Sequence, residues 1–141
     1  AGSLSKKFGI KEGTSLADTL IEYCLKSDEL GDPHISSEHI LNIGLCSFDE
    51  LELIDEYSLR INDILRGIFY SIGINLIDFK LEFGICKKTK EVILADEISP
   101  DTCRLWDLKT NKKLDKDRFR RDLGDVEGAY QEVLERLNIK S

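Results

Sequence analysis

One long helical pattern, over residues about 48–72, constrains the fold more than any other feature of the chain. Its apolar side chains recur at helical spacing and so share one face: Ile54, Tyr57, Ile61, Ile64, Leu65, Ile68, Phe69 and Ile72. Ser47 and Glu50 match a capping box, in which each satisfies a free backbone N–H of the first turn. Gly73 suits the left-handed residue that ends a helix. The pattern predicts a core helix, and the alternative is an amphipathic helix that binds a partner.

The bulk composition is that of one globular domain. The chain has 141 residues, of which 41% are hydrophobic and 33% are charged, enough to bury a core. No apolar run approaches the ~18 residues of a membrane span, and no basic-then-apolar signal segment opens the chain. A formal charge of −7 disfavours non-specific binding to nucleic-acid phosphates. We therefore expect a cytoplasmic protein with neither nucleic acid nor a membrane as partner.

The spacing of the cysteines and the absence of methionine lead to two further expectations. The four cysteines form no Cys-x-x-Cys pair and no zinc spacing with histidine, which predicts reduced thiols: Cys24, Cys46, Cys86 and Cys103. Methionine is absent, even from position 1, where Ala1 stands. We therefore expect this chain to be the C-terminal part of a longer protein.

The remaining elements are shorter. Local signals predict a helical turn over 3–8, a strand over 20–25, a turn at 31–33, a helix over 37–43, hairpin strands near 74–84 and 91–98, and an irregular segment over 99–114. Asp115 is expected to cap a short helix that ends at Gly124, and Asp125 to cap the last helix. Together these elements predict an α+β fold, in which an antiparallel hairpin packs with the long helix and the C-terminal helices.

Residues 78–84 alternate apolar and charged side chains without a break. In an extended strand, Asp78, Lys80 and Glu82 point to one face, because successive side chains alternate. Asp78 and Glu82 would then lie about 13 Å apart, too far to share one ion easily. A hairpin centred near residue 89 would instead place Glu82 opposite Asp96. This pattern indicates a charged strand face with a second acidic residue across the hairpin.

Two interpretations of this charged face stay open. Two carboxylates about 5 Å apart repel each other unless a cation bridges them, and Mg²⁺ commonly takes one or two carboxylates together with substrate phosphates. Lys80 could then meet a phosphate oxygen. The alternative is a solvated hairpin whose Lys and Glu side chains merely pair. The residues alone favour neither.

A basic cluster follows the hairpin. It holds eight of the chain's twenty basic residues within eighteen positions: Arg104, Lys109, Lys112, Lys113, Lys116, Arg118, Arg120 and Arg121. Lys116 and Arg120 are four residues apart and share a helix face. Interleaved aspartates allow ordinary surface ion pairing as the alternative. Because the rest of the chain is acidic, the cluster indicates a pocket for a small phosphate or carboxylate rather than a nucleic-acid groove.

Six segments together resemble one enzyme family. They are Ala1-Gly2-Ser3-Leu4, Gly31-Asp32-Pro33, Asp78-Phe79-Lys80-Leu81-Glu82-Phe83-Gly84, Asp96-Glu97-Ile98-Ser99-Pro100-Asp101, Arg104-Leu105-Trp106-Asp107 and Asp115-Lys116-Asp117-Arg118-Phe119-Arg120. In order and spacing the chain resembles the C-terminal part of the phosphoribosylaminoimidazole-succinocarboxamide synthases, or SAICAR synthetases, of purine biosynthesis. The resemblance covers essentially the whole chain.

The resemblance implies a chemistry and a set of site residues. Such enzymes use MgATP to join L-aspartate to carboxyaminoimidazole ribonucleotide through an acyl phosphate. The resemblance implies that Glu82 and Asp96 hold Mg²⁺ against the ATP phosphates and that Lys80 neutralises charge on the transferred phosphoryl group. The resemblance also implies that Asp78 and Asp32 lie near the imidazole carboxylate and that Ser3 and Arg104 bind the ribonucleotide 5′-phosphate. It implies further that the nucleotide and aspartate pockets are completed by Asp101, Lys116 and Arg120.

The chain departs from the family pattern on its N-terminal side. The family's N-terminal lobe carries a hairpin that covers ATP, and that hairpin is absent from this sequence. We therefore expect residues 1–141 to form the C-terminal lobe of an ATP-grasp-like SAICAR synthetase fold, to be inactive alone and to expose apolar surface. The expected partner is the N-terminal lobe of the same protein, and a homodimer is left open. Two alternatives are another Mg-ATP phosphotransferase and a non-catalytic anion-binding module.

Overall fold

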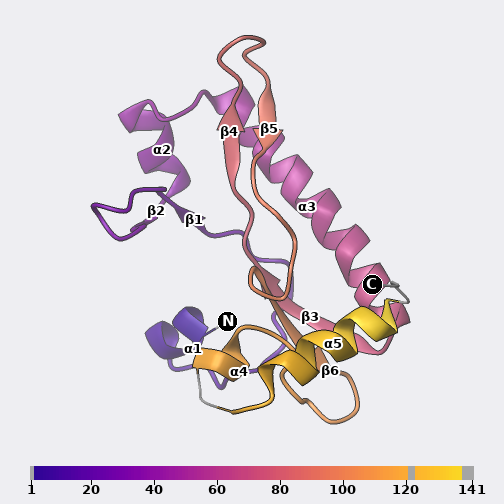
Figure 1. Cartoon of the computed structure of the whole chain (residues 1–141). Coiled ribbons are helices and arrows are strands. Elements are labelled where there is room, and N and C mark those ends of the chain that lie inside the picture. The colour runs from indigo at the N-terminus through magenta and orange to yellow at the C-terminus, as the bar shows by residue number, and fades with distance from the viewer. Residues whose placement is uncertain (1, 121–122, 138–141) are drawn as a thin grey trace.

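The computed structural model describes residues 2–120 and 123–137 and has a mixed α+β architecture (Figure 1). The helices are α1 (Gly2–Phe8), α2 (Ser37–Ile43), α3 (Phe48–Ser71), α4 (Asp117–Arg120) and α5 (Val126–Arg136). The strands are β1 (Tyr23–Cys24), β2 (His34–Ile35), β3 (Ile74–Phe79), β4 (Phe83–Ile85), β5 (Val92–Leu94) and β6 (Cys103–Asp107). They pair antiparallel as β1–β2, β3–β6 and β4–β5.

The long helix α3 begins and ends as its sequence predicts. The Ser47 hydroxyl accepts the backbone N–H of Glu50 at 3.1 Å, and the Glu50 carboxylate accepts that of Ser47 at 2.8 Å. The capping box is thus complete and fixes the first turn. Past the last turn, Gly73 has a φ of 78°, a left-handed conformation that glycine adopts without strain. The chain therefore reverses directly into β3.

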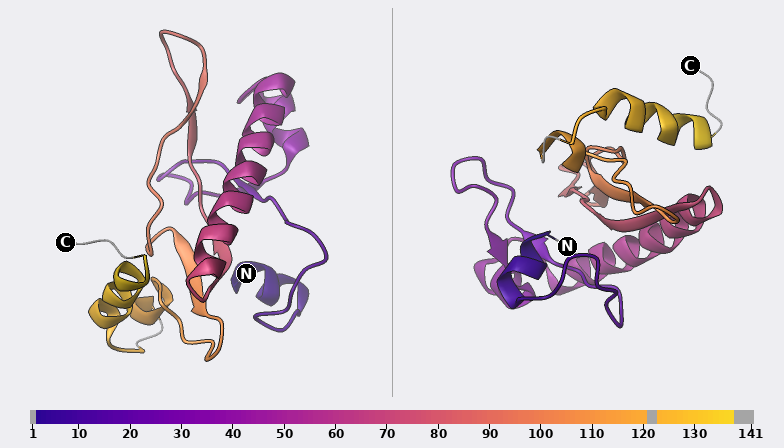
Figure 2. Two further views of the ribbon diagram at one scale, coloured as in Figure 1. Left: turned by 90° about the vertical axis from the view of Figure 1, so that its right-hand side faces the viewer. Right: turned by 90° about the horizontal axis from the view of Figure 1, so that it is seen from below.

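The core forms where α3, α5 and the β3–β6 ribbon meet. Seen from below, the ribbon lies between α3 and α5 (Figure 2, right). The cluster of buried side chains combines residues from these elements with the segment before α4: Phe69, Ile74, Leu76, Cys103, Leu105, Leu114, Ala129 and Val133. Removing these apolar side chains from water is the main force that holds the helices to the ribbon. The core therefore lies at one end of α3.

The expected continuous strand over 74–84 is wrong. The structure divides it into β3, which pairs with β6, and β4, which pairs with β5. The residues between them switch partners, since the Lys80 N–H still donates to the Thr102 carbonyl at 2.8 Å while the Glu82 carbonyl already accepts from Ala95 at 2.8 Å. A register irregularity between Leu76 and Asp78 adds to the change of direction. Alternation alone predicted an extended chain but could not reveal this exchange of partners.

The expected irregular segment over 99–114 is also partly wrong, because it contains β6. This strand pairs with β3 in a register that sets Ile74 against Asp107 and Phe79 against Cys103. The turn that follows is closed by Asp107, whose Oδ1 accepts the backbone N–H groups of Lys109 and Thr110 at 2.9 Å each. A five-residue strand in which the charged residues Arg104 and Asp107 do not alternate regularly with apolar ones gives too weak a pattern to be found alone.

The β4–β5 hairpin extends away from the core beside α3 (Figure 1). It is shorter than predicted, because its second strand covers only Val92–Leu94 instead of 91–98. Phe83 pairs with Leu94 and Ile85 with Val92, so the hairpin is centred between residues 88 and 89. The predicted centre at 89 is therefore displaced by half a residue, which matters for the carboxylates discussed below.

The N-terminal half is loop-rich and carries short elements. Helix α2 covers Ser37–Ile43, as predicted, and the expected strand over 20–25 shrinks to Tyr23–Cys24. The predicted turn at 31–33 is present, with Asp32 left-handed at a φ of 49°. The Asp32 Oδ1 accepts the backbone N–H of Ser27 at 2.8 Å, which closes this turn.

Of the two N-terminal caps expected for the last two helices, one is present. The Asp115 Oδ1 accepts the backbone N–H of Asp117 at 2.7 Å at the start of α4, as expected. The described part of α4 ends at Arg120, and residues 121–122, which lie between it and the predicted end at Gly124, are outside the described residues. Asp125 precedes α5 in a left-handed conformation and makes no side-chain cap bond, so its predicted capping role is wrong.

Two further features concern the whole described chain. The four cysteines are free thiols, and only Cys103 is buried. Within residues 2–120 and 123–137, no helix combines the length and the apolar character that crossing a bilayer requires.

Candidate functional site

Four charged side chains meet where the β4–β5 hairpin leaves the core. The Lys80 Nζ lies 3.1 Å from Glu82 Oε1 and 3.9 Å from Asp96 Oδ2. The Lys26 Nζ, from the loop after β1, lies 2.6 Å from the other oxygen of Glu82. We call Lys26, Lys80, Glu82 and Asp96 the hairpin cluster. The structure thus brings together Lys80 and both predicted metal ligands, and adds Lys26.

The predicted pairing of Glu82 with Asp96 is off by one residue. The register places Glu82 opposite Ala95, whose N–H donates to the Glu82 carbonyl at 2.8 Å. Asp96 follows the end of β5 and approaches the cluster from beyond the ladder, where Lys80 lies within reach of both carboxylates. A shared ammonium, rather than a direct cross-strand pair, therefore gathers the two carboxylates.

The hairpin cluster fits a divalent cation of the Mg²⁺ type. Its carboxylates supply hard oxygen ligands, and their side chains are 21% exposed for Glu82 and 31% for Asp96, so a ligand can reach them. Within the described residues, no group of three or more His, Cys, Asp or Glu side chains forms a full protein cage for a metal. Mg²⁺ commonly takes one or two protein carboxylates and completes its shell with water and phosphate oxygens.

The charges around Glu82 keep it ionised. Hydrogen bonds from Lys26 and then Lys80 hold the pKa of the Glu82 carboxyl below its ordinary value, and burial opposes them only in part. The bond to Glu82 reciprocally raises the pKa of the Lys26 ammonium. Glu82 therefore stays ionised at neutral pH and offers a carboxylate to a cation.

A second cluster surrounds Arg104 on β6. The Arg104 Nη1 donates to Asp78 Oδ2 at 2.8 Å, and the Nε donates to Asp117 Oδ2 at 3.0 Å. Burial alone would lower the pKa of this guanidinium, but the two carboxylates outweigh it and raise the pKa. We call Asp78, Arg104 and Asp117 the Arg104 cluster. Asp78 thus pairs with an arginine in this cluster, whereas Glu82 belongs to the hairpin cluster.

Asp115 supports the Arg104 cluster by bonding to the backbone on both sides of it. Its side chain is fully buried, and its two oxygens accept the backbone N–H groups of Leu105 at 2.6 Å and Asp117 at 2.7 Å. Burial raises the pKa of the Asp115 carboxyl, and the two N–H donors oppose that rise. Asp115 therefore joins the start of α4 to the middle of β6.

The loop between β5 and β6 presents the predicted site residue Asp101. Its Oδ1 accepts a hydrogen bond of 2.7 Å from the phenol of Tyr130 on α5. Burial, followed by the neighbouring Asp101, raises the pKa of Tyr130 above its ordinary value. The phenol therefore remains a donor at neutral pH, and α5 holds this loop in place.

Four predicted site residues remain: Asp32, Lys116, Ser3 and Arg120. Asp32 is exposed and closes its own turn, and Lys116 is half-buried with its backbone N–H bonded to the Pro100 carbonyl at 3.0 Å. The side chains of Ser3 and Arg120 lie outside the described residues, so their predicted roles stay predictions. The structure thus assembles two charged clusters, whereas Asp32 closes its own turn instead.

Sequence reasoning missed three residues that contact the predicted site residues. Lys26 lies in a polar loop with no motif of its own, and no motif marks Tyr130 on the last helix as a partner of Asp101. In the sequence, Asp117 is one of several aspartates interleaved with the basic residues. The capping signal at Asp115 was the one hint to Asp117, because a cap places the residue two positions later beside it.

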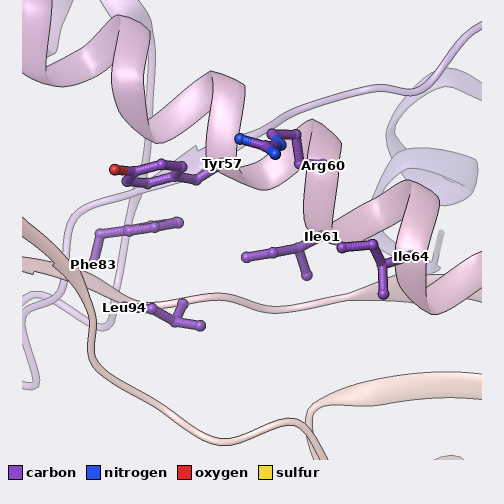
Figure 3. A pocket seen from close by; sticks show the side chains of 6 residues that line it. All are labelled: Tyr57, Arg60, Ile61, Ile64, Phe83 and Leu94. Carbon is purple, nitrogen blue, oxygen red and sulfur yellow. The ribbon is translucent and has the colours of Figure 1, made fainter.

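An apolar hollow separates the hairpin from α3. Its volume is about 240 Å³, and its lining comes from one face of α3 and from the hairpin strands: Tyr57, Arg60, Ile61, Ile64, Phe83 and Leu94 (Figure 3). The expected exposed apolar surface is present here, since Ile64 is 61% exposed. No residue of either charged cluster lines the hollow, so the candidate chemistry lies elsewhere.

The fold and the site define a mixed α+β protein with two separate charged clusters, one at the hairpin and one around Arg104. Residues 1–137 match the family model described as SAICAR synthetase. The chain belongs to the SAICAR synthetase family.

Relatives and solved structures agree with this assignment. The chain is 59% identical to the phosphoribosylaminoimidazole-succinocarboxamide synthase of Sphingopyxis alaskensis, over 99% of this chain and 55% of the relative. It is 60% identical to that of Pelagibacter ubique, over 98% of this chain and 54% of the relative. The crystal structure of the Ehrlichia chaffeensis synthase matches with a TM-score of 0.95 and 51% identity, over 100% of this chain and 61% of that one.

A solved SAICAR synthetase in complex with ADP also matches, with a TM-score of 0.92 and 48% identity. It covers 100% of this chain and 60% of that structure. The chain therefore spans a little over half the length of the proteins it resembles.

Proposed function

We propose that this chain contributes the metal- and ribonucleotide-binding part of a SAICAR synthetase. The complete reaction is the ATP-dependent ligation of L-aspartate to carboxyaminoimidazole ribonucleotide, with SAICAR, ADP and phosphate as products. The observation that carries the proposal is the hairpin cluster, in which Lys80 lies between two carboxylates, within a chain of this family. The neighbouring structure with ADP supports nucleotide binding.

In this proposal the hairpin cluster serves the nucleotide. Glu82 and Asp96 would hold Mg²⁺, which when bound neutralises phosphate charge and orients the nucleotide. Lys80 remains beside them as a positive charge for the transferred phosphoryl group. Because such transfers need little covalent work from the protein, positioning and charge neutralisation supply most of the catalysis.

The Arg104 cluster would serve the ribonucleotide. Arg104 is the candidate contact for the 5′-phosphate, together with Ser3, because a guanidinium matches phosphate geometry. Asp78 and Asp32 would lie near the imidazole carboxylate. Asp101, Lys116 and Arg120 would complete the nucleotide and aspartate pockets. Once the carboxylate is activated as an acyl phosphate, the aspartate amine displaces phosphate and the amide forms.

The direct test removes the two carboxylate charges. We expect the double variant Glu82→Gln, Asp96→Asn to lose binding of Mn²⁺, used as a paramagnetic substitute for Mg²⁺, and of MgADP by calorimetry. Glu91→Gln is the matched control, because Glu91 is an exposed carboxylate of the same hairpin. Unchanged Mn²⁺ and MgADP affinity in the double variant would overturn the proposal.

Turnover separates this proposal from its alternatives. We expect this chain alone to give no full turnover in a coupled ADP-release assay with all three substrates. In the complete enzyme, ADP release should depend on L-aspartate, whereas another Mg-ATP phosphotransferase would release ADP without it. A non-catalytic anion-binding module would bind ribonucleotide and never release ADP.

A further inference from the structure

Arg104 is held by two carboxylates that differ in how firmly they are fixed. Asp78 belongs to β3, lies opposite Arg104 in the ladder, and has a side chain that is 33% exposed. The side chain of Asp117 is only 4% exposed and accepts from the Arg104 Nε at 3.0 Å. The buried partner therefore sets the direction of the guanidinium more strictly than the exposed one.

The contacts of Asp117 close a ring that begins and ends on β6. The Leu105 N–H donates to Asp115, the Asp117 N–H donates to the other oxygen of Asp115, and Asp117 accepts from Arg104. Arg104 and Leu105 are adjacent in β6, so four residues, Arg104, Leu105, Asp115 and Asp117, constrain one another. Such a ring leaves the guanidinium little freedom to rotate.

This ring does not raise the positive charge of the site. Asp78, Arg104 and Asp117 together carry a net charge of −1, which by itself opposes an anion. Among the described residues, the Nη2 nitrogen of Arg104 has no hydrogen-bond acceptor, and the side chain is 21% exposed. Asp117 thus leaves one edge of the guanidinium available and fixes where that edge points.

We propose that Asp117 is a positioning residue, which orients Arg104 so that its Nη2 edge receives the phosphate of the ribonucleotide. The inference rests on the proposed function, because it takes Arg104 as the phosphate contact. Without Asp117, the arginine would have to be ordered when the ligand binds, and ordering a long side chain weakens binding. Asp117 acts through hydrogen bonding, and its negative charge is incidental.

Two substitutions separate orientation from charge. Asp117→Asn keeps an oxygen that can accept from the Arg104 Nε, whereas Asp117→Ala removes both the acceptor and the charge. We expect Asn to hold the affinity for ribose 5-phosphate within about twofold of the unsubstituted chain, and Ala to weaken it about three- to tenfold, the range expected from one immobilised side chain. If both variants bind more tightly, the charge of Asp117 matters more than its hydrogen bond, and the proposal is wrong.

The readout is a titration of the isotope-labelled chain with ribose 5-phosphate, followed by NMR at the Arg104 Nε–H signal. The same signal reports side-chain order without ligand, which should fall in Asp117→Ala and persist in Asp117→Asn. Glu132→Ala is the matched control, because Glu132 is also paired with an arginine, Arg136, but on α5. It should change neither the order of Arg104 nor the phosphate affinity.

The two proposals fail in different ways. If Arg104 stays ordered in Asp117→Ala, the positioning role is refuted, whatever the phosphate affinity. If the unsubstituted chain and Arg104→Gln respond identically to ribose 5-phosphate, Arg104 is not the phosphate contact, and the site assignment fails with it. Thermal unfolding of each variant shows whether it has lost the fold. If Asp117→Ala has lost it, the order of Arg104 is measured in Asp117→Asn, where it must persist if the proposal is right.

Discussion

Arg136 Nη2 lies 2.5 Å from Asp107 Oδ2 and joins the last turn of α5 to the end of β6. The same guanidinium bonds Glu132 on its own helix at 2.6 Å and the Gly73 carbonyl at 3.1 Å, just beyond α3. One side chain thus ties together three elements that come from distant parts of the sequence. The Arg136 side chain is 25% exposed, so water screens these contacts only in part.

Replacing Arg136 should loosen this junction. Arg136→Met keeps the aliphatic stem but removes the charged donor from the Asp107 carboxylate and from the Gly73 carbonyl, which then keep only their backbone N–H donors among the described residues. We expect the free energy of unfolding to fall by about 1–3 kcal/mol, the cost of removing partners from part-buried polar groups. Urea denaturation measures it. Lys112→Met is the matched control, because its more exposed ammonium pairs with one carboxylate, Glu132, among the described residues, and it should change stability by less than about 0.5 kcal/mol. Equal effects of the two substitutions would contradict this prediction.

The Asp107 carboxylate should make stability depend on acid. Its bond from Arg136, followed by the Thr110 N–H, holds the pKa of Asp107 well below its ordinary value. A lowered pKa in the folded state stabilises the protein above the unfolded pKa of about 4, and this stabilisation is lost as the pH falls below that value. Asp107→Asn should therefore be less stable than the natural chain at pH 7, with a smaller gap at pH 3. Denaturation at both pH values checks this, and a constant gap would refute it.

Lys26 should compete with a cation at Glu82. The Lys26 ammonium is 76% exposed and lies 2.6 Å from Glu82 Oε2, so a metal must displace it or share that carboxylate. Lys26→Met should therefore tighten Mn²⁺ binding about two- to fivefold at low salt, the effect of losing one exposed ion pair. Lys87→Met controls for net charge, since Lys87 is an exposed lysine of the hairpin loop. Equal tightening by both variants would point to a general charge effect, and no tightening would contradict a role of Glu82 as ligand.

The bond between Tyr130 and Asp101 should steady the loop before β6. Tyr130→Phe removes one hydroxyl and leaves the ring packed against the core, so we expect a loss of about 0.5–1.5 kcal/mol, the usual net value of one hydrogen bond. Hydrogen exchange should rise at Asp101 and Thr102 and stay unchanged in α3. Uniformly faster exchange would instead show a general loss of stability.

The elements that the sequence predicted well are those specified by neighbouring residues. The capping box of Ser47 and Glu50 and the glycine at 73 define α3 within a span of local contacts, and α2 ends at Gly44 for the same reason. In the same way, the order Asp78, Lys80, Glu82 marked a charged strand segment before any fold was known. Local hydrogen bonds and side-chain periodicity are written directly in the order of residues.

The strand partners could not be predicted in this way. Asp78 and Arg104 lie 26 residues apart, and their contact depends on β3 pairing with β6 rather than continuing into the hairpin. The half-residue displacement of the hairpin centre likewise set Glu82 against Ala95 and left Asp96 to approach through Lys80. Register follows from the turn and from the packing of a whole face, so it is a property of the assembled sheet.

By itself, then, the sequence determined which charged side chains this protein has available and which helices carry its core. Only the tertiary structure decided how those charges divide, with Lys26 and Lys80 around Glu82 in one cluster and Asp117 behind Arg104 in the other. The physical reason is that an ion pair between distant residues forms only after the apolar core has fixed the strands, because the pair alone is too weak to overcome the entropy of closing the loop between them.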